Sequence, residues 1–513
     1  MPTTTENNKR IAKNTLILYV RMIFMMIVSL YTSRVVLNAL GVEDYGVYNV
    51  VGGVVTMFSF VSSSLSAAIN RFMVFELGTG NMAKLKRVFS TGVTIQLGIS
   101  VVFILLAETI GLWFLNTQIN IPDGRMQAAN WVLHLSVLSF ILGLISVPYN
   151  SAIIAHERMS AFAYVSILDA VCKLAVAYAL TVTPFDRLVS YAVLLVAVST
   201  LIRLVYGIYC KRNFEECTYH FIFDRSLFRA MTAFAGWNFL GTTAHLFNNQ
   251  GINVLMNIFF GVTVNAARAV AIQLDAIVRQ FVANFMTAVS PQITKYCAAR
   301  DYGSMQLLLF RAAKFATFLF LLFAIPIGFE APLLLDLWLK NPPDYGAVFA
   351  QLLLLGVLVD AVLGNNLYHA TMATGNIKKY EIVISVCAVT NFLLTWVAFL
   401  LGCPPQAAYI IWFVVYGFLI YVRLRILRGL IGLSLAAYAT HVVFRILPVM
   451  ALSVIAPVAF HILLPQGLLR LILVCIVCTP ITMLLSYSLG MTHSERNFVK
   501  EKITDRLHVI SRH

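Results

Sequence analysis

The stretches LNALGVEDYG (residues 37–46) and MNIFFGVTVN (residues 256–265) decide the fold of this sequence. Each closes a long apolar run, and each places an asparagine a few residues before Gly-Val. A third segment, GNMAKL at residues 80–85, is followed about 220 residues later by GSMQLL at residues 303–308. Recurrence at one offset indicates that the chain was built from two copies of one unit.

A further match lies at nearly the same offset. VPYNSAIIAHERMSAFAYVSI aligns with NLYHATMATGNIKKYEIVISV, pairing Tyr149 with Tyr368 and Ser166 with Ser385. An even number of helices in each copy, six, would keep both copies in the same orientation. The sequence therefore predicts parallel repeats, an arrangement typical of transporters.

The composition around these segments is that of a membrane protein. Of 513 residues, 60% are hydrophobic and 12% are charged, whereas soluble proteins carry about 25% charged residues. The apolar runs are long enough to span a bilayer as helices. We expect an all-α membrane protein with about fourteen transmembrane helices: two six-helix lobes plus two extra C-terminal helices. The predicted spans are 14–38, 46–70, 91–115, 128–154, 161–182, 188–210, 233–260, 262–290, 307–330, 346–372, 381–401, 407–427, 441–463 and 468–490.

The net charge of +15 comes from basic clusters that alternate between successive inter-helix segments. This is the positive-inside pattern rather than a nucleic-acid surface, and it places both termini in the cytoplasm. We expect a multi-pass protein of the bacterial cytoplasmic (inner) membrane whose first helix is retained. The predicted regions are an N-lobe (1–210), a cytoplasmic connector (211–232), a C-lobe (233–430), helices thirteen and fourteen (431–490) and a basic tail (491–513). In the tail, Phe498, Ile503, Leu507 and Ile510 would share one face of an interfacial helix.

Charge inside the spans is most concentrated in VTVNAARAVAIQLDAIVRQFVANF (262–285). Asn265, Arg268, Asp275 and Arg279 fall on one helical stripe, which has to face protein or water. We take a water-filled cavity as the simpler interpretation. Asp275 and Arg279 would pair as i,i+4 neighbours, leaving Arg268 as a net positive charge.

Other polar residues inside the spans have less specific interpretations. Arg21 and Arg34 either snorkel to the headgroups or face a cavity. Asp360 stands alone in the sequence and is either a proton or cation site or a protonated structural residue; Glu108 is a weaker candidate for the same role. Asp169 and Lys173 would form a structural pair. The histidines inside the spans would be hydrogen-bond partners between helices: His134, His245 and His369.

Enzyme chemistry has little support in this sequence. The short outer loops carry isolated acids, and we find no metal cluster, nucleophile motif or phosphate-binding glycine loop. Cys475 and Cys478 form a C-x-x-C pair, but they lie within a wholly apolar helix. We therefore predict no catalytic residues, no metal and no cofactor.

Two segments resemble a known family: SRVVLNALGVEDYGVYNVVGGVV, and the 262–285 segment followed by AVSPQI. They are similar to bacterial polysaccharide (O-antigen, Wzx-type) flippases of the MOP superfamily, which also holds MATE multidrug exporters and the lipid II flippase. The resemblance implies two six-helix lobes around a central cavity, with an oligosaccharide on undecaprenyl diphosphate as substrate. It also implies that Arg21, Arg34, Arg71 and Arg268 face the diphosphate.

The predicted function is translocation of this lipid-linked oligosaccharide (an O-antigen, capsule or exopolysaccharide repeat unit) from the inner to the outer leaflet by alternating access. Asn265, Asp275, Arg279, Asp360 and Glu108 would supply polar or coupling groups of the cavity. Expected partners are the lipid-linked oligosaccharide, membrane lipids and a polysaccharide polymerase, with no nucleic acid and a monomeric chain. The alternative is a MATE-like exporter of cationic drugs, which would need an acidic cavity. A membrane glycosyltransferase or polymerase would need an active site carried by loops.

Overall fold

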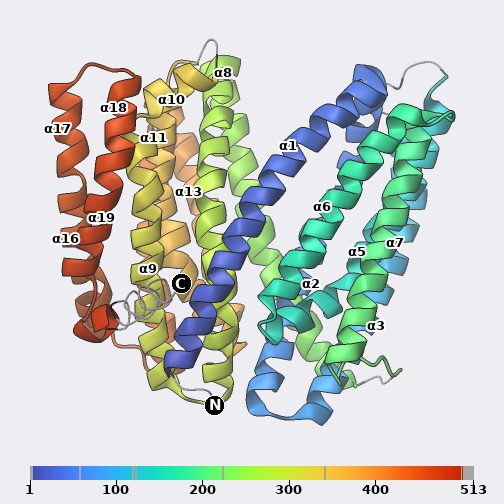
Figure 1. Cartoon of the computed structure of the whole chain (residues 1–513), viewed down its shortest axis with the longest axis horizontal. Coiled ribbons are helices and arrows are strands. Elements are labelled where there is room, and N and C mark those ends of the chain that lie inside the picture. Colours follow the sequence, from blue (N-terminus) through green and yellow to red (C-terminus); the bar gives the residue numbers. More distant parts are fainter. Residues whose placement is uncertain are drawn as a thin grey trace, which may run out of the picture. The chain divides into compact units, whose positions relative to one another are not determined.

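A computed structural model describes residues 4–56, 59–117, 121, 124–221, 224–339, 343–497 and 500. Within these ranges the chain is helical throughout and contains no β-strand (Figure 1). A helix satisfies all its backbone hydrogen bonds internally, which is what hydrocarbon requires of a spanning segment. The predicted all-α membrane class is confirmed.

The helices are separated by short turns, and five π-helical stretches (η1 to η5) interrupt them. The elements are α1 (Thr4–Thr56), α2 (Ser59–Thr79), α3 (Met82–Leu106), η1 (Ala107–Gly111), α4 (Leu112–Thr117), α5 (Met126–Ala155), α6 (Met159–Val182), α7 (Arg187–Asn213), α8 (Arg225–Ala298), α9 (Tyr302–Phe329), α10 (Ala331–Trp338), α11 (Gly346–Val357), η2 (Leu358–Gly364), α12 (Asn365–Thr374), α13 (Lys378–Leu400), α14 (Ala407–Ile431), α15 (Leu435–Tyr438), η3 (Ala439–Val443), α16 (Phe444–Ser453), α17 (Ile455–Leu463), α18 (Leu468–Leu473), η4 (Val474–Cys478), α19 (Thr479–Leu485) and η5 (Ser486–Gly490).

Twelve segments of the described chain are long and apolar enough to cross a membrane. One of them is α8, whose 74 residues would extend about 110 Å as a straight helix. Gly261 breaks it with φ 81° and ψ −177°, so α8 supplies two passes. Gly41 breaks α1 in the same way, with φ 80° and ψ 170°. When α8 is counted twice, and α2 is joined to the end of α1 as a further pass, the total reaches about fourteen.

Two helix caps are separated in the chain by the same number of residues as Gly41 and Gly261. Asn81 caps α3 by accepting a hydrogen bond from the Lys84 amide, and Asp301 caps α9 by accepting one from the Ser304 amide. The two caps have the same separation in the chain as Gly41 and Gly261, so positions 80–85 correspond to 300–305. The predicted alignment of GNMAKL with GSMQLL was wrong by three residues, because it paired the two Gly-x-Met patterns instead of the two capping residues.

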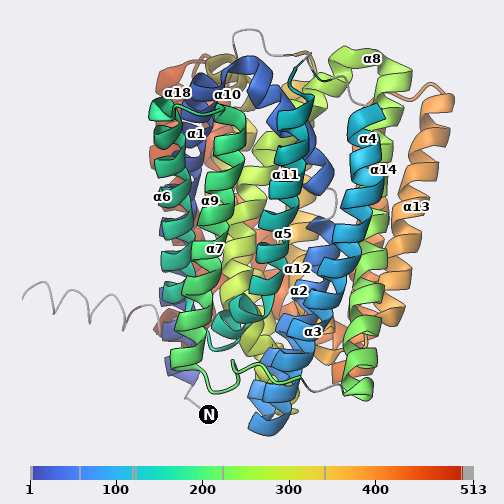
Figure 2. The same cartoon turned by 90° about the vertical axis from the view of Figure 1, so that its right-hand side faces the viewer.

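The chain forms two compact units, an N-unit of residues 12–242 and a C-unit of residues 1–11 and 243–513. In the N-unit, α5 packs against α2, α3 and α7, and α6 runs beside α7 (Figure 2). Its connector is shorter than predicted, since only residues 214–224 separate α7 from α8. Arg125 ties three of its segments together by binding Asp44 through Nε (2.7 Å) and Nη2 (2.6 Å), and by binding Asp186 at the start of α7.

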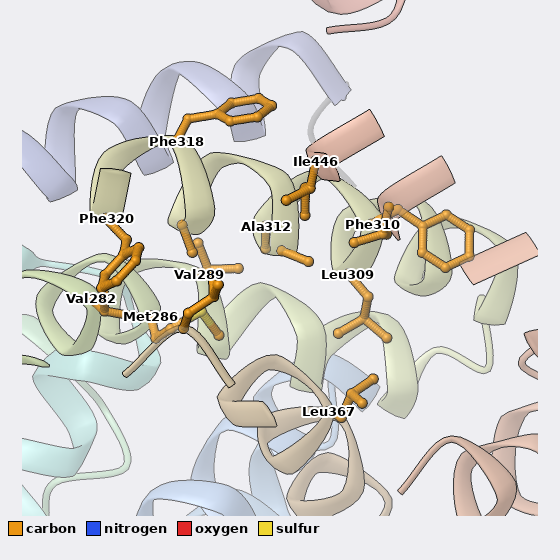
Figure 3. Packing of buried hydrophobic residues seen from close by; sticks show 14 of the residues in the cluster. Val282, Met286, Val289, Leu309, Phe310, Ala312, Phe318, Phe320, Leu367 and Ile446 are labelled. Atoms are coloured by element: carbon orange, nitrogen blue, oxygen red, sulfur yellow. The ribbon is translucent and has the colours of Figure 1, made fainter. Parts of the chain in front are cut away.

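The C-unit contains one large apolar core to which the last two spans contribute. Val282 and Met286 of α8, Phe320 of α9 and Leu367 of α12 meet Ile446 of α16 in this core (Figure 3). The helices α16, α17 and α19 all pack against α9. The predicted tail residues Phe498, Ile503, Leu507 and Ile510 lie outside the described residues.

Two buried ion pairs fix the last spans to α9. Arg470 of α18 donates to Glu330, just after α9, from Nε (2.8 Å) and Nη2 (3.0 Å). Lys314, in the middle of α9, lies 2.7 Å from Glu495, just after η5. None of the four residues is more than 6% exposed. The hairpin of spans thirteen and fourteen is therefore clamped to α9 at two levels.

Candidate functional site: charged groups inside the spans

The polar stripe of α8 lies against protein within the C-unit. Arg268 is 6% exposed; its Nε donates to Asn253 Oδ1 (2.6 Å) and its Nη1 to the Tyr409 hydroxyl (3.3 Å). Asn253 precedes the Gly261 break, and Tyr409 belongs to α14. Arg268 and Asp275 are therefore buried within the C-unit, whereas Asn265 and Arg279 of the same stripe are half-buried. Both partners are neutral, so the charge of Arg268 is not compensated by them.

Further along the stripe, charges form a network of two acids and two bases. Arg279 Nε lies 2.7 Å from Asp275 Oδ2, which confirms the predicted i,i+4 pair. Arg279 Nη1 also lies 3.2 Å from Asp360 Oδ2, and Arg423 Nη2 lies 3.8 Å from Asp360 Oδ1. The prediction that Asp360 stands alone was wrong. Formal charge balances across the four groups.

The backbone around Asp360 is shaped for this network. Asp360 and Gly364 lie in η2, and π-helical turns of this kind are common at functional sites. A Cβ atom at Gly364 would overlap the Arg423 guanidinium, so the small residue admits the cation. Arg423 also lies 5.4 Å from the centre of the Tyr380 ring. A change at Gly364 would therefore displace Arg423 from the acid.

The N-unit holds three of the predicted arginines in different surroundings. Arg21 lies 4.4 Å from the centre of the Phe162 ring and donates to Ser166 Oγ (3.2 Å). Arg71 lies between Phe72 and Phe75 of its own helix, 4.7 Å and 4.5 Å from their ring centres. Arg34 is exposed, and among the described residues no side chain forms an ion pair or hydrogen bond with it.

Two of the remaining polar candidates, His134 and His369, join helices. His134 Nδ1 lies 2.8 Å from Glu108 Oε1 in η1, and His369 Nδ1 lies 3.0 Å from Ser290 Oγ, so both histidines are hydrogen-bond partners between helices as predicted. Asp169 and Lys173 form the expected pair at 2.7 Å. Asn265 is half-buried beside the Gly261 break. Among the described residues, no three potential metal ligands are grouped.

Sequence reasoning missed Arg423, Tyr409 and Asn253. Arg423 belongs to a basic run near the end of a span, so the charge pattern placed it among the cytoplasmic cations, yet it is only 3% exposed. Nothing in the sequence separates Arg423 from a headgroup cation. No sequence pattern around Tyr409 or Asn253 predicted a contact with Arg268.

The family profile described as "Polysaccharide biosynthesis protein" matches residues 11–297, more than half of the sequence. The chain belongs to the polysaccharide biosynthesis protein family. No curated protein matches it.

This family member has the fold of MATE transporters. A MATE in the bent conformation is 13% identical, with a TM-score of 0.73 over 86% of this chain and 100% of that chain. A multidrug resistance MATE family transporter of the MOP superfamily in the outward-facing conformation is 14% identical, with a TM-score of 0.70 over 83% of this chain and 96% of that chain. A MOP superfamily transporter from Pyrococcus furiosus, described as having a binding pocket of reverse polarity, is 14% identical with a TM-score of 0.69 over 84% and 96%. The chain is therefore a multi-pass membrane protein of the polysaccharide biosynthesis protein family with the fold of MATE transporters.

Proposed function

We propose that this protein is a flippase that moves an undecaprenyl-diphosphate-linked oligosaccharide from the inner to the outer leaflet. The observation that carries the proposal is Arg34, an exposed cation inside a span with no acidic partner in the described chain. A charge at that position is costly in hydrocarbon and marks a path for solutes or ions. An anionic headgroup is the partner that it favours.

The acids inside the spans argue against a cationic drug as the substrate. Asp169, Asp275 and Asp360 each lie within ion-pair distance of a lysine or arginine. Arg21, Arg34 and Arg268 have no carboxylate partner in the part of the chain that the structure describes. The balance inside the spans is therefore positive, which favours a diphosphate and disfavours the alternative of a MATE-like drug exporter.

Among the four arginines, the surroundings suggest an order of involvement. Arg34 is available to bind oxygens of a diphosphate without giving up a contact. Arg21 and Arg71 lie against aromatic rings that would hold their guanidinium groups in place. Arg268 would contact the diphosphate with donors left over from Asn253 and Tyr409. A charge-assisted contact of this type contributes about 1.5–3 kcal/mol.

Coupling groups are proposed in the four-charge network. Asp360 bridges Arg279 and Arg423, so its protonation would weaken its contacts with both arginines and change the packing of η2, while Arg279 keeps its pair with Asp275. Asp275, Arg279 and the half-buried Asn265 extend the same stripe, and Glu108 with His134 is a second candidate in the N-unit. We propose alternating access of the two lobes as the transport mode, with a polysaccharide polymerase receiving the product.

Transport into sealed vesicles tests the function directly. Purified full-length protein would be reconstituted into liposomes containing a fluorescent undecaprenyl-diphosphate sugar, and quenching from outside would report the fraction exposed in the outer leaflet. The proposal expects faster equilibration than in protein-free vesicles, and slower equilibration with Arg34→Ala. Equal rates with and without protein, together with export of a cationic dye by the same vesicles, would overturn it.

A further inference from the structure

On one side of the span before the Gly261 break lie four amide side chains: Asn249, Gln250, Asn253 and Asn257. At 100° per residue these positions fall within an arc of about 100°, and they extend over about 12 Å of helix. Such a stripe is unusual in a span, because a neutral amide exposed to hydrocarbon costs several kcal/mol without a hydrogen-bond partner.

The structure leaves this stripe open. Asn249, Gln250 and Asn257 are exposed, and Asn253 is half-buried. The buried face of the same helix is mainly apolar, with Ile252, Leu255 and Met256 in the core. Its buried amide, Asn248, accepts a hydrogen bond from Asn391 Nδ2 (3.0 Å). The amides of the stripe are therefore not oriented toward the interior of the C-unit.

The exposed surface of this helix is divided into two halves. Phe247, Val254 and Ile258 are exposed by 70%, 57% and 69% and lie on the flank next to the amides. That flank suits acyl chains, whereas the amide stripe suits water or a polar solute. Two adjacent surfaces of opposite character fit a helix at the edge of a polar passage.

Arg268 orients the centre of the stripe. An arginine only donates hydrogen bonds, so its contact fixes the Asn253 oxygen toward Nε (2.6 Å). The Asn253 amide nitrogen then donates to Gln250 Oε1 (3.1 Å). This series of hydrogen bonds leaves the Gln250 amide nitrogen free to donate. Among the described residues no side chain binds the Asn249 or Asn257 amides.

The chemistry of the free groups selects the ligand. Neutral amides offer paired donors and acceptors, which match vicinal hydroxyl and acetamido groups. They carry no charge for a diphosphate or a cation. We propose that this amide stripe binds the sugar part of the lipid-linked substrate, an inference that rests on the proposed function.

The other copy of the repeat lacks this array. Its equivalent positions, counted back by the separation of Gly41 and Gly261, hold Ser29, Leu30, Ser33 and Leu37. Two hydroxyls replace four amides, and Arg34 follows directly. The amide stripe is therefore a feature of the second copy alone.

Binding of two lipids to the full-length protein in nanodiscs tests the sugar assignment. The probes are undecaprenyl diphosphate and undecaprenyl diphosphate carrying N-acetylglucosamine. The unaltered protein is expected to bind the glycosylated lipid more tightly. Asn249→Leu/Asn257→Leu should lose about tenfold in affinity for the glycosylated lipid and none for the bare lipid. Asn249→Gln/Asn257→Gln should recover part of the loss, and Val254→Leu/Ile258→Leu on the apolar flank should match the unaltered protein.

The outcomes separate the two proposals. If the unaltered protein binds neither lipid, the proposed function fails. If it binds both and the leucine variant keeps the full preference for the glycosylated lipid, the amide stripe is not the sugar site. A loss of affinity for both lipids in the leucine variant would also overturn the sugar assignment, because it would show a general effect on the binding site.

Discussion

Gly41 and Gly261 occupy equivalent positions in the two copies of the repeat and have the same backbone conformation, with φ 80° and 81° and ψ close to 180°. This region is essentially closed to residues with a Cβ atom. Each glycine ends one pass and starts the next, in α1 and in α8. The repeated Gly-Val sequence thus marks a backbone turn that occurs in both copies.

Replacing either glycine tests that turn. Gly41→Ala and Gly261→Ala should each destabilise the protein by about 1–3 kcal/mol, because alanine is strained at this φ although no atom lies within 4 Å of its Cβ. Thermal unfolding in detergent would measure the effect. Gly98→Ala, at a helical and equally open position, should leave the midpoint unchanged or raise it. Tolerance of alanine at both glycines would contradict the conformational explanation.

Arg34 and Arg268 should respond differently to substitution. Arg34→Ala removes an exposed, unpaired cation, so polysaccharide export should fall while the amount of protein in the membrane stays normal. Arg268→Ala should lose most activity, and Arg268→Lys should keep part of it, because lysine retains the charge but not the planar fork. Export would be measured as surface polysaccharide in a strain lacking its own flippase.

A control arginine sharpens that comparison. Arg203 lies 4.1 Å from the centre of the Tyr149 ring, within the N-unit, and its position in the sequence predicts a headgroup cation. Arg203→Ala should leave export near the parental level. Normal accumulation and full export by Arg268→Ala would show that Arg268 is not a substrate ligand, and the cationic site would then rest on Arg21, Arg34 and Arg71.

The buried Glu330–Arg470 pair should show the asymmetry typical of such pairs. Arg470→Met leaves a carboxylate buried without its partner, at a cost of about 3–5 kcal/mol. Glu330→Leu combined with Arg470→Met removes both charges and should recover most of that loss. Unfolding midpoints of the two single variants and the double variant would give the coupling. Strictly additive losses would show that the pair is not coupled.

Acid should weaken the Arg125 cluster at the start of α7. Burial alone would raise the pKa of Asp186, but hydrogen bonds from Arg125 and the Val189 amide hold its pKa below the ordinary value. A lowered pKa adds stability above the ordinary aspartate pKa of about 3.9, and that stability is lost as the pH falls below it. The thermal unfolding midpoint should therefore decrease when the pH is lowered below about 4. Arg125→Gln should lower the midpoint at pH 7 and reduce the acid-dependent drop, whereas Arg212→Gln, an exposed cation, should change neither.

The membrane topology remains to be tested with reporter fusions. The charge pattern predicts that fusions after Gln118, Pro184, Pro342 and Pro404 report the outer side, with both termini in the cytoplasm. Alkaline phosphatase activity at all four sites would support this. A cytoplasmic signal at any two of them would break the helix count and the repeat.

Periodicity predicted which residues share a face but not what that face touches. Asn265, Arg268, Asp275 and Arg279 were correctly placed on one stripe, because a 3.6-residue period follows from backbone geometry. Their partners Tyr409, Asp360 and Arg423 come from helices far along the chain, and nothing local encodes that pairing. Arg423 was misplaced for the same reason: a basic residue near a helix end looks alike whether it points to water or into the protein.

The clamp between the last hairpin and α9 limits how such a chain can change over evolutionary time. A descendant that lost spans thirteen and fourteen, with the segment that follows them, would leave Glu330 without Arg470 and Lys314 without Glu495. Two charged side chains would then lack ion-pair partners in a region without water. Loss of the hairpin is therefore tolerable only together with neutral replacements at both positions of α9 and its end. Gain of the hairpin would likewise require Glu330 and Lys314 to appear together with Arg470 and Glu495. The added spans and the charges that hold them are therefore inherited together.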